Sequence, residues 1–506
     1  MESYPWWTEE QKEFEKEIIA FAEEIMPMDE ETKWTREFPW SIFEKIAGKG
    51  YAGAGVPKEY GGLGLGATGA CIAAEALNRM PGVGRTFVGN MLGGLRQVIE
   101  FGTEKQKKRF LTNIAKGEIG AIAITEPFVG TDASAMEMTA RRKGEVYILN
   151  GKKRFIVSAG VASRYMVYAR TSDGPDDRKS YRHLTGFIVE KGMKGFTVEK
   201  INEIIGFDNV QNGVLDFDDV PVPVENRIGN EGEGWRVMTA GLNFERTLIC
   251  DQTLGWMREL LRNTVPYAQR RGQFGRPTIE FTNNQFKIAD LISKVMIGRL
   301  LTYYTAYLWD LGWDITMESN VAKVFCCEGA LQSSLDAIQV MGGDGVTPFY
   351  PLEAFMKVAK VENIAGGTME ACRLVIYRTG LRQMAEELKM PRRVIHQELG
   401  VPVRISGKPE KQKEIDEAKL LKVMAEDYRI NPGLHMSRED IKEYYDVDDS
   451  KLDEILMSLE KKDFVRLFRD KKGIALVKAT YEGLRKSNPS EYYQWYPAWV
   501  KKENLF

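Results

Sequence analysis

Hydrophobic residues recur at three- and four-residue steps through the first part of the chain. Phe14, Ile18, Phe21 and Ile25 are separated mainly by glutamate, lysine and alanine, and this spacing places the apolar side chains on one face of a helix. A helical pattern continues to about residue 120. The sequence therefore predicts an N-terminal helical domain over residues 1–120.

The hydrophobic period changes from helical to strand-like near Ala121. Tyr147-Ile148-Leu149 and Phe155-Ile156-Val157 flank Asn150-Gly151, a dipeptide typical of type I′ hairpin turns. The further strand-like segments, separated by turn residues, are Tyr165–Ala169, Gly186–Val189, Phe196–Val198 and Val214–Phe217. Together these segments predict a central β domain over residues 121–232.

Helical periodicity returns at Trp235 and continues to about Leu388, with few internal prolines. Segments of this length predict a bundle of several long helices over residues 233–388. The fold class is therefore mainly α with a central β domain, in the order α, β, α. The residues that follow, 389–412, are densely charged and rich in proline, which is typical of a linker.

A second, smaller unit is predicted over residues 413–506. Its elements are an amphipathic helix over Ala418–Tyr428, helices that begin at Ser437 and Ser450, and strands over Phe464–Phe468 and Ile474–Lys478. The serines are suitable helix caps, and a Lys-Lys-Gly turn separates the strands. Three helices followed by a two-stranded wing is the order of a winged-helix module, so a small α+β, winged-helix-like domain is expected.

The composition fits a globular protein of three or four domains. The 506 residues are 43% hydrophobic and 28% charged, with a net charge of -2, which does not favour nucleic-acid binding. The five cysteines lack C-x-x-C spacing, so neither a disulfide framework nor a zinc site is indicated. No signal peptide and no long apolar run is found, and we expect a cytoplasmic protein without a membrane span.

The sequence offers few residues for metal binding or for catalysis by histidine. The three histidines, His183, His396 and His435, are isolated among polar or loop-like neighbours, and we expect solvent-facing or capping imidazoles. A G-x-G-x-x-G match over Gly64–Gly69 follows a turn sequence rather than a β-branched run. A dinucleotide loop must leave a strand and begin a helix, so this match is not interpreted as one.

Five motifs in the same order resemble those of acyl-CoA dehydrogenases. They are Ala123–Asp132, Gly151–Ile156, Arg271–Gly275, Asp336–Gly343 and Gly367–Glu370. The resemblance covers about residues 1–388 and implies the family's α, β, α architecture, an FAD cofactor and an acyl-CoA substrate. It also implies a homotetramer or homodimer that passes electrons to an electron-transfer flavoprotein.

The resemblance assigns a set of residues to the flavin and the substrate. In the family, Thr125 belongs to a segment that bonds the flavin ring, Thr131 lies beside the CoA arm, and Phe155 takes the place of an aromatic against the ring. Arg271 resembles an arginine that reaches the FAD pyrophosphate from a neighbouring subunit. The further residues assigned to the cofactor by the motifs are Gly130, Thr131, Val157, Phe274, Gln339, Gly343, Thr368 and Glu370. Val157 stands where a threonine near flavin N5 is usual, so one hydrogen bond to the ring is expected to be missing.

The catalytic base is expected on a helix. Dehydrogenation of an acyl thioester needs a carboxylate to remove the α-proton. Most of the family has a glutamate just before the Gly-Thr pair, where this chain has Gly366; glycine keeps the backbone N–H that polarises the thioester carbonyl. Gly241–Leu248 resembles the helix of isovaleryl-CoA and long-chain acyl-CoA dehydrogenases that carries the base. Glu245 is therefore the predicted base, and Arg246 is expected to contact CoA.

Several alternatives remain open at this stage. The glycine loop leaves room for a branched, cyclic or aromatic acyl group. The same residues would also serve an enoyl-CoA reductase running the reverse reaction, and a non-catalytic scaffold would bind flavin and acyl-CoA without turnover. A DNA-binding homologue is a further alternative. Residues 391–506 contain 23 Lys and Arg against 21 Asp and Glu, and the third predicted helix of this unit is acidic, so phosphate binding is not favoured.

Overall fold

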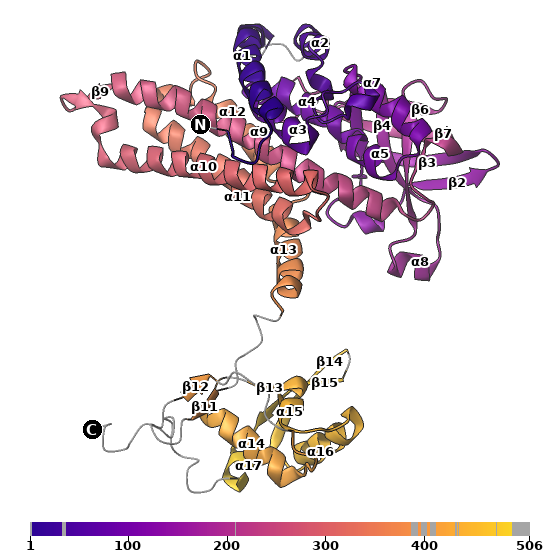
Figure 1. Ribbon diagram of the computed structural model, residues 1–506, viewed down its shortest axis with the longest axis vertical. Coiled ribbons are helices and arrows are strands. Elements are labelled where there is room, and N and C mark those ends of the chain that lie inside the picture. The colour runs from indigo at the N-terminus through magenta and orange to yellow at the C-terminus, as the bar shows by residue number, and fades with distance from the viewer. Residues whose placement is uncertain are drawn as a thin grey trace. The chain divides into compact units, whose positions relative to one another are not determined.

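The computed structural model describes residues 3–32, 37–207, 209–385, 393–395, 402–404, 411–430, 433, 435–471 and 473–487. The chain divides into two compact units, Met1–Gln383 and Met384–Phe506. The first unit contains helical, β and helical parts in that order along the chain (Figure 1). The predicted fold class, mainly α with a central β domain, is confirmed. Of the predicted linker, only 393–395, 402–404 and 411–412 lie among the described residues.

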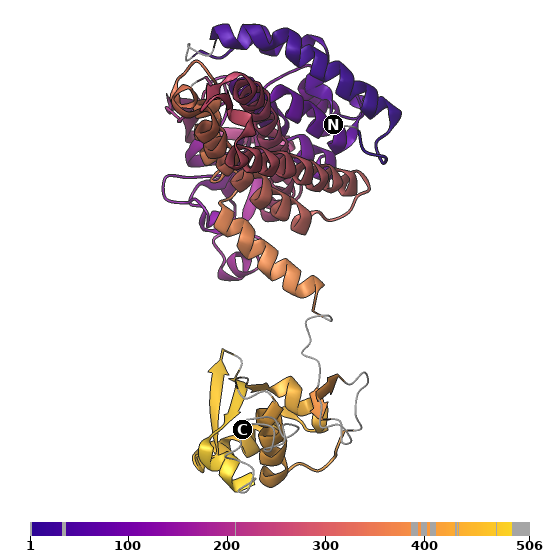
Figure 2. The same ribbon diagram turned by 90° about the vertical axis from the view of Figure 1, so that its left-hand side faces the viewer.

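The N-terminal part is helical, as its periodicity predicts. Its helices are α1 (Glu9–Thr32), α2 (Trp40–Gly48), α3 (Gly66–Leu77), α4 (Pro81–Leu92), α5 (Leu95–Phe101), α6 (Glu104–Gln106) and α7 (Thr112–Ala115), with short turns η1 (Tyr51–Gly53), η2 (Lys58–Tyr60) and η3 (Lys107–Leu111). Phe14, Ile18, Phe21 and Ile25 are all buried, and α1 packs on α3 (Figures 1 and 2).

The glycine-rich segment before α3 leads to a helix whose first amides already have an acceptor. The backbone N–H groups of Ala67 and Thr68 donate to the Asp310 carboxylate over 2.6 and 3.0 Å, and the Thr68 hydroxyl donates over 2.7 Å. A short 3₁₀ turn, not a strand, precedes the segment. The structure thus agrees that this motif is not a dinucleotide loop, because a side-chain anion takes the position that a phosphate would need.

The central part is one twisted, mainly antiparallel sheet. Its strands are β1 (Gly120–Ala123), β2 (Thr139–Lys143), β3 (Val146–Ile156), β4 (Arg164–Arg170), β5 (Leu184–Glu190), β6 (Phe196–Ile201), β7 (Gly213–Pro223) and β8 (Arg227–Ile228), with η4 (Ala133–Ala135), α8 (Pro175–Lys179) and η5 (Val224–Asn226) between them. The strand order is β6-β7-β3-β2-β4-β5-β8, and β1 pairs with β4 in parallel. The sheet brings the ends of β1 and β3 together.

The hairpin predicted at Asn150-Gly151 is wrong. Both residues lie inside the single strand β3, and the hairpin turn falls instead between β2 and β3, at Gly144. The strand is irregular at Gly151, whose φ is +140°, and the Asn150 side chain exchanges two 2.9 Å hydrogen bonds with Asp219 on β7. The dipeptide therefore forms a bulge, where a positive φ and a polar side chain are equally suitable.

The third part is a bundle of long helices. Its elements are α9 (Gly234–Arg270), β9 (Gly272–Gln273), β10 (Arg276–Pro277), η6 (Thr278–Glu280), α10 (Thr282–Asp310), α11 (Thr316–Met341), η7 (Gly342–Val346), α12 (Leu352–Glu362) and α13 (Met369–Gln383). Helix α9 packs against α10, α11 and α3. The β9–β10 hairpin lies at one end of the bundle (Figure 1). One continuous hydrophobic core joins this bundle to the N-terminal helices.

The second unit has its own hydrophobic core. Its elements are β11 (Arg393–Ile395), β12 (Pro402–Arg404), α14 (Glu417–Ile430), β13 (Met436–Ser437), α15 (Arg438–Tyr444), α16 (Asp449–Lys461), β14 (Val465–Asp470), β15 (Gly473–Ala479) and α17 (Tyr481–Ser487). Ser437 caps α15 as predicted, in a capping box with Asp440. The cap of α16 is Asp448 rather than Ser450, because the helix begins two residues earlier than the serine suggests. The winged-helix assignment stays a prediction.

Two further expectations concern histidine and the membrane. His183 is 2% exposed and its Nε2 lies 2.8 Å from the Ser134 carbonyl oxygen, so the expectation of a solvent-facing imidazole is wrong for this residue. The start of β5 carries it into the sheet domain. His396 lies outside the described residues. In the parts of the chain that the structure describes, no helix has the length and apolar character needed to cross a membrane.

Candidate functional site

Glu245 faces the loop between α12 and α13. Its side chain comes from α9 and is 5% exposed. A Cβ built at Gly366 would lie 3.4 Å from Glu245 Cγ, 3.5 Å from Glu245 Cδ and 2.9 Å from Ile249 Cδ1. Gly366 also has a φ of +65°, which favours glycine. The helix-borne carboxylate therefore lies in the space into which a side chain of the loop would point.

The carbonyl groups of this loop are held by two buried or half-buried cations. Arg246 Nε donates to the Gly366 carbonyl over 3.0 Å, and Lys323 Nζ donates to the Ala365 and Gly367 carbonyls over 2.6 and 2.5 Å. Burial lowers the pKa of the Arg246 guanidinium. Because the carbonyls are turned toward these cations, the Gly366 N–H is left without an acceptor among the described residues.

Two charged residues beside Glu245 are not identified by sequence reasoning. Arg85 of α4 places Nη2 3.8 Å from Glu245 Oε1 and Nε 3.4 Å from Glu362 Oε1 of α12. Glu362 is fully buried, and this burial raises the pKa of its carboxyl group. The available signal was weak: Glu362 follows Val358 and Ala359 on the buried face of α12, where a charge is unusual.

The end of β3 and the end of β1 form a second part of the site. Phe155 and Ser158 have φ of +60° and +62°, and the pairing of β3 with β7 shifts at this point. The Arg154 N–H donates to the Thr125 carbonyl over 2.8 Å, which ties the predicted flavin segment to the bulge. Phe155 is 49% exposed. Bulges often redirect side chains next to active sites, and this one exposes an aromatic face beside Thr125.

A buried ion pair supports the turn that carries Thr125. Lys153 Nζ lies 2.8 Å from Glu126 Oε1 and donates to the Ile124 carbonyl over 3.0 Å. The Glu126 carboxylate also accepts the backbone N–H groups of Glu137 and Met138 over 2.6 and 3.1 Å. Burial lowers the pKa of the Lys153 ammonium. Sequence reasoning missed both partners, because the pair forms only when the sheet closes.

Replacing Lys153 with methionine is expected to destabilise the protein by about 3–5 kcal/mol, because it leaves the Glu126 charge buried without its partner. Chemical denaturation followed by circular dichroism measures the loss. Lys152→Met is the matched control, since Lys152 is exposed on the same strand and bonds Glu199 over 2.6 Å; its cost should stay below about 1 kcal/mol. Equal losses in the two variants contradict the supporting role of the pair.

The remaining predicted flavin residues lie at the far end of the bundle. Arg271, Phe274, Gln339 and Gly343 are all exposed. Tyr267 Oη donates to Asp344 Oδ2 over 2.5 Å, which joins the end of α9 to η7. At 1.5 Å per helical residue, Arg271 lies about 39 Å from Glu245 along α9. The structure therefore does not bring this group together with Glu245 in one chain.

The other predicted residues differ in their surroundings. Thr368 accepts the Ala371 N–H over 3.3 Å and so begins α13 next to the glycine loop. Val157 is half-buried and packs against the core of the bundle. Gly130, Thr131 and Glu370 are exposed. The predicted contacts of these residues with FAD or CoA stay predictions.

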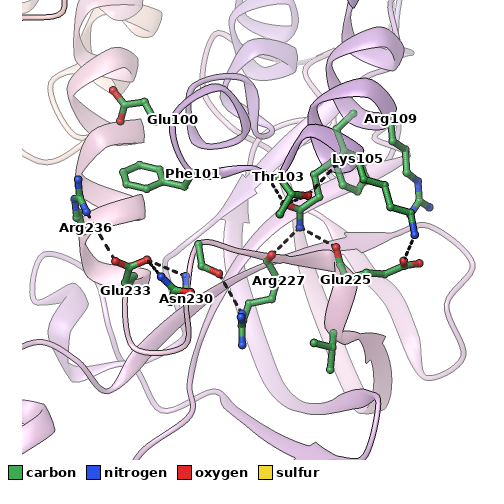
Figure 3. Close-up of a pocket in the computed structure, with 14 residues that line it drawn as sticks. Glu100, Phe101, Thr103, Lys105, Arg109, Glu225, Arg227, Asn230, Glu233 and Arg236 are labelled. Carbon is green, nitrogen blue, oxygen red and sulfur yellow. Dashed lines mark hydrogen bonds and ion pairs between the residues drawn. The ribbon is translucent and has the colours of Figure 1, made fainter.

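A separate cavity of about 710 Å³ lies on another face of the first unit. It is lined by α5, α6 and η3 on one side and by β8 and the start of α9 on the other (Figure 3). Its charged groups bond one another: Lys105 Nζ lies 2.6 Å from Glu225 Oε2, and Gln106 Nε2 donates to the Glu225 and Arg227 carbonyls. Polar groups satisfied in this way have little to offer a ligand.

Three family models match the chain in succession. They describe the N-terminal, middle and C-terminal domains of acyl-CoA dehydrogenase, and they match residues 8–118, 121–220 and 232–381. The chain belongs to the acyl-CoA dehydrogenase family, whose members are FAD-dependent oxidoreductases. This confirms the resemblance noted from the five motifs and identifies the protein as an FAD-dependent enzyme of acyl-CoA α,β-dehydrogenation or its reverse.

Curated relatives and solved structures agree with this assignment. An acyl-CoA dehydrogenase of Bacillus subtilis is 37% identical over 73% of this chain and 97% of its own length. Acryloyl-CoA reductase (NADH) of Anaerotignum propionicum is 33% identical over 74% of this chain and 95% of its own. Butyryl-CoA dehydrogenase of Megasphaera elsdenii superposes with a TM-score of 0.71 at 31% identity, covering 76% of this chain and 100% of that one.

A further solved chain comes from work on the electron-transferring flavoprotein of Acidaminococcus fermentans and flavin-based electron bifurcation. It superposes with a TM-score of 0.72 at 36% identity and covers 75% of this chain and 100% of that one.

The residues of this chain fit the flavin group. The buried Ser158 hydroxyl has no hydrogen-bond partner among the described residues, and none of them bonds the Thr125 hydroxyl, while Phe155 offers an apolar face. A ring with polar edges and an apolar plane needs both kinds of contact. Thr125, Phe155 and Ser158 thus offer both kinds of contact, and the assignment of particular residues to the ring stays a prediction.

Proposed function

We propose that this enzyme uses Glu245 as the base that removes the α-proton of an acyl-CoA thioester. The observation that carries the proposal is the position of the Glu245 carboxyl carbon, 3.5 Å from where a Cβ of residue 366 would lie. Most of the family has its glutamate at this loop position. A carboxylate from α9 that reaches the same space can remove the same proton, since general-base catalysis depends on where the carboxylate lies.

The loop supplies the second contribution to the chemistry. The Gly366 N–H, which has no acceptor among the described residues, is available to a thioester carbonyl oxygen. A donor at that oxygen makes the α-proton more acidic, because it stabilises the charge that develops as the proton leaves. Glu245 then receives the proton on a carboxylate oxygen. When bound, FAD would supply the acceptor for the hydride that leaves Cβ, while the proton stays on Glu245.

The acyl group is proposed to be branched, cyclic or aromatic, because the base is expected on α9, as in the isovaleryl-CoA dehydrogenases that Gly241–Leu248 resembles, rather than on the loop. An anaerobic screen tests this with butyryl-, isovaleryl-, cyclohexanecarboxyl- and 3-phenylpropionyl-CoA, in which bleaching of the bound flavin is followed. We expect the isovaleryl, cyclic or phenylpropionyl thioester to bleach the flavin faster than butyryl-CoA. A clear preference for butyryl-CoA contradicts the substrate class, and no bleaching by any thioester favours a non-catalytic scaffold.

The physiological direction and the electron partner are proposed from the relatives. The acryloyl-CoA reductase relative suggests that a protein of this fold can also catalyse the reverse reaction, the reduction of an enoyl-CoA. The chain solved in work on an electron-transferring flavoprotein suggests a flavoprotein as the electron partner. Reoxidation of the substrate-reduced enzyme by such a flavoprotein, compared with oxidation of the photoreduced enzyme by an enoyl-CoA, tests the two directions.

We also propose that the site is shared between copies of this chain in a homodimer or homotetramer. Ile292, Met296, Leu300 and Tyr304 form a stripe of exposed side chains at four-residue steps on α10, and such a stripe is typical of an interface. Arg271 and its neighbours would complete the flavin site of a second copy. The separation of about 39 Å along α9 supports this, because one FAD molecule cannot reach across it within a single chain.

Subunit complementation is the expected consequence. Glu245→Gln and Arg271→Gln should each be nearly inactive alone, yet hybrids formed by co-expression should recover activity, because one of their sites combines the intact Glu245 of one copy with the intact Arg271 of the other. Activity of differently tagged, co-purified hybrids measures this. Hybrids as inactive as the parents contradict the shared site, provided that each parent binds its normal partner.

The C-terminal unit is proposed to be a winged-helix-like interaction module that does not bind nucleic acid. Residues 391–506 contain 23 Lys and Arg against 21 Asp and Glu, and some of these cations are paired: Arg438 lies 2.7 Å from Asp449, and Arg469 lies 2.5 Å from Glu460. Cations paired in this way are less available to phosphate. We further propose a cytoplasmic location, since the five cysteines are all buried and unpaired, as is usual in a reducing compartment.

A further inference from the structure

Arg85 lies between two buried carboxylates that come from different helices. Its Nη2 is 3.8 Å from Glu245 and its Nε is 3.4 Å from Glu362. Its Nη1 donates to Gln252 Oε1 over 3.1 Å, and Gln252 donates in turn to Asn78. The side chains of Arg85, Glu245 and Glu362 are each at most 6% exposed. The guanidinium is thus fixed by an amide and shared by two carboxylates.

The charges of this cluster do not balance when both carboxylates are ionised. One guanidinium then faces two negative charges in a region with little water. Both oxygens of Glu362 lack a hydrogen-bond partner among the described residues, so nothing but Arg85 and the more distant Lys323 compensates its charge. Two carboxylates that share one site do not ionise independently, since the charge on one disfavours the charge on the other.

We propose that Arg85 and Glu362 are positioning residues for the reaction: Arg85 holds the Glu245 side chain turned toward Gly366, and Glu362 competes with Glu245 for the charge of Arg85. The inference rests on the proposed role of Glu245 as the base. It extends that proposal, because it names the charged groups that determine the pH range in which the enzyme is active.

The groups that face this cluster come from every helix and strand packed on it. Arg85 comes from α4, Arg246 lies next to Glu245 on α9, Lys323 and the buried Cys327 come from α11, and the buried Cys372 comes from α13. Tyr168 of β4 is also near, and burial, together with a smaller effect of the Glu245 charge, raises the pKa of its phenol. Arg246 and Lys323 already donate to carbonyls of the glycine loop. Arg85 is therefore the cation whose charge is divided between the two carboxylates.

The direction of the pH effect follows from the charges. An ionised Glu362 adds a negative charge near Glu245 and draws on Arg85, so it weakens the interaction between Arg85 and the proposed base. Burial raises the pKa of Glu362, which places its own ionisation nearer to the working pH range. Removing the Glu362 charge should move the acidic limb of the activity profile to lower pH, and removing the Arg85 charge should move it to higher pH.

Four variants of the FAD-loaded enzyme test the proposal. The rate of flavin reduction by the fastest thioester of the screen is measured against pH. Glu362→Gln should shift the acidic limb down by about one to two pH units, and Arg85→Gln should shift it up by a similar amount. The double variant should return toward the wild-type position, and Arg85→Lys, which keeps the charge, should shift little. A merely structural role would lower the rate without opposite shifts.

A measurement that needs no substrate accompanies the profile. Infrared titration of protein labelled with ¹³C at the glutamate carboxyl carbons should detect a buried carboxyl group that loses its proton at or below the acidic limb of the profile, and Glu362→Gln should remove this band. If the band is absent in the wild type, or survives in Glu362→Gln, the proposal is overturned even if no thioester reduces the flavin.

The two proposals fail in different ways. If Glu245→Gln keeps its rate of flavin reduction, the base assignment itself fails. If Glu245→Gln is inactive while the profiles of Glu362→Gln and Arg85→Gln coincide with the wild type, Glu245 remains the base and only the role of Arg85 and Glu362 is overturned.

Discussion

Replacing Glu245 with glutamine is expected to lower the rate of flavin reduction by an acyl-CoA about a hundred- to ten-thousand-fold, which is the range that a positioned general base contributes. Glutamine keeps the size of the side chain but cannot accept the α-proton. The carboxyl carbon of Glu245 is among the three nearest atoms to a Cβ placed at Gly366. Anaerobic stopped-flow spectroscopy of the bound flavin measures the change directly.

Binding must be separated from chemistry in this variant. Glu245→Gln should retain FAD and should still bind the CoA thioester, as judged by perturbation of the flavin spectrum. Glu259→Gln is the matched control: Glu259 is also buried on α9, but it lies 2.5 Å from Arg79, away from the glycine loop. That variant should lose stability and keep its rate per bound flavin. A Glu245→Gln enzyme as fast as the wild type rules out the proposed base.

Replacing Gly366 with alanine is expected to reduce the same rate by at least about tenfold. A Cβ at this position comes within 2.9 Å of Ile249 and 3.4 Å of Glu245, so the base must shift, and a misplacement of about 1 Å is enough to cost a large part of the rate. The φ of +65° adds about 1–2 kcal/mol of backbone strain for alanine. Flavin reduction and thermal unfolding of the loaded enzyme measure the two effects.

Gly48→Ala provides the control for this substitution. A Cβ at Gly48 meets nothing within 4 Å, and its φ is not in the left-handed region, so both stability and rate should stay close to the wild type. If Gly366→Ala keeps the full rate, the contact between the loop and Glu245 does not position the base.

Sequence patterns predicted the large features of the fold because these depend on local spacing. The four apolar residues of α1 are buried as their helical period predicts, and the strand segments fall within β4, β5, β6 and β7. The hairpin at Asn150-Gly151 was predicted wrongly, since the same dipeptide suits both a turn and a bulge. Only the partner strand decides between a turn and a bulge. Here the Asn150 side chain donates a hydrogen bond to Asp219 of β7.

The sequence named Glu245, on which the proposed site is built, but not the residues around it; the role of Glu245 stays a prediction. The motif around Glu245 pointed to a helix-borne base, and Gly366 pointed to a loop without one. Arg85 and Glu362 escaped notice, because Arg85 is the single charged residue of α4 and Glu362 is one of several charged residues of α12. A single charged residue produces no hydrophobic period that could be recognised in the sequence. Its function depends on the residues of the helix that packs against it.

By itself the sequence determined the order of helical and β parts, the family motifs and the absence of a glutamate in the loop, since all of these lie in neighbouring residues. Only the tertiary structure decided that Glu245 fills the space at Gly366, that Arg85 joins two buried carboxylates, and that Arg271 lies about 39 Å along α9 from the base. These contacts join segments that are far apart in the chain. They arise from the packing of helix on helix, and the local alternation of polar and apolar residues specifies which face is buried but not which partner covers it.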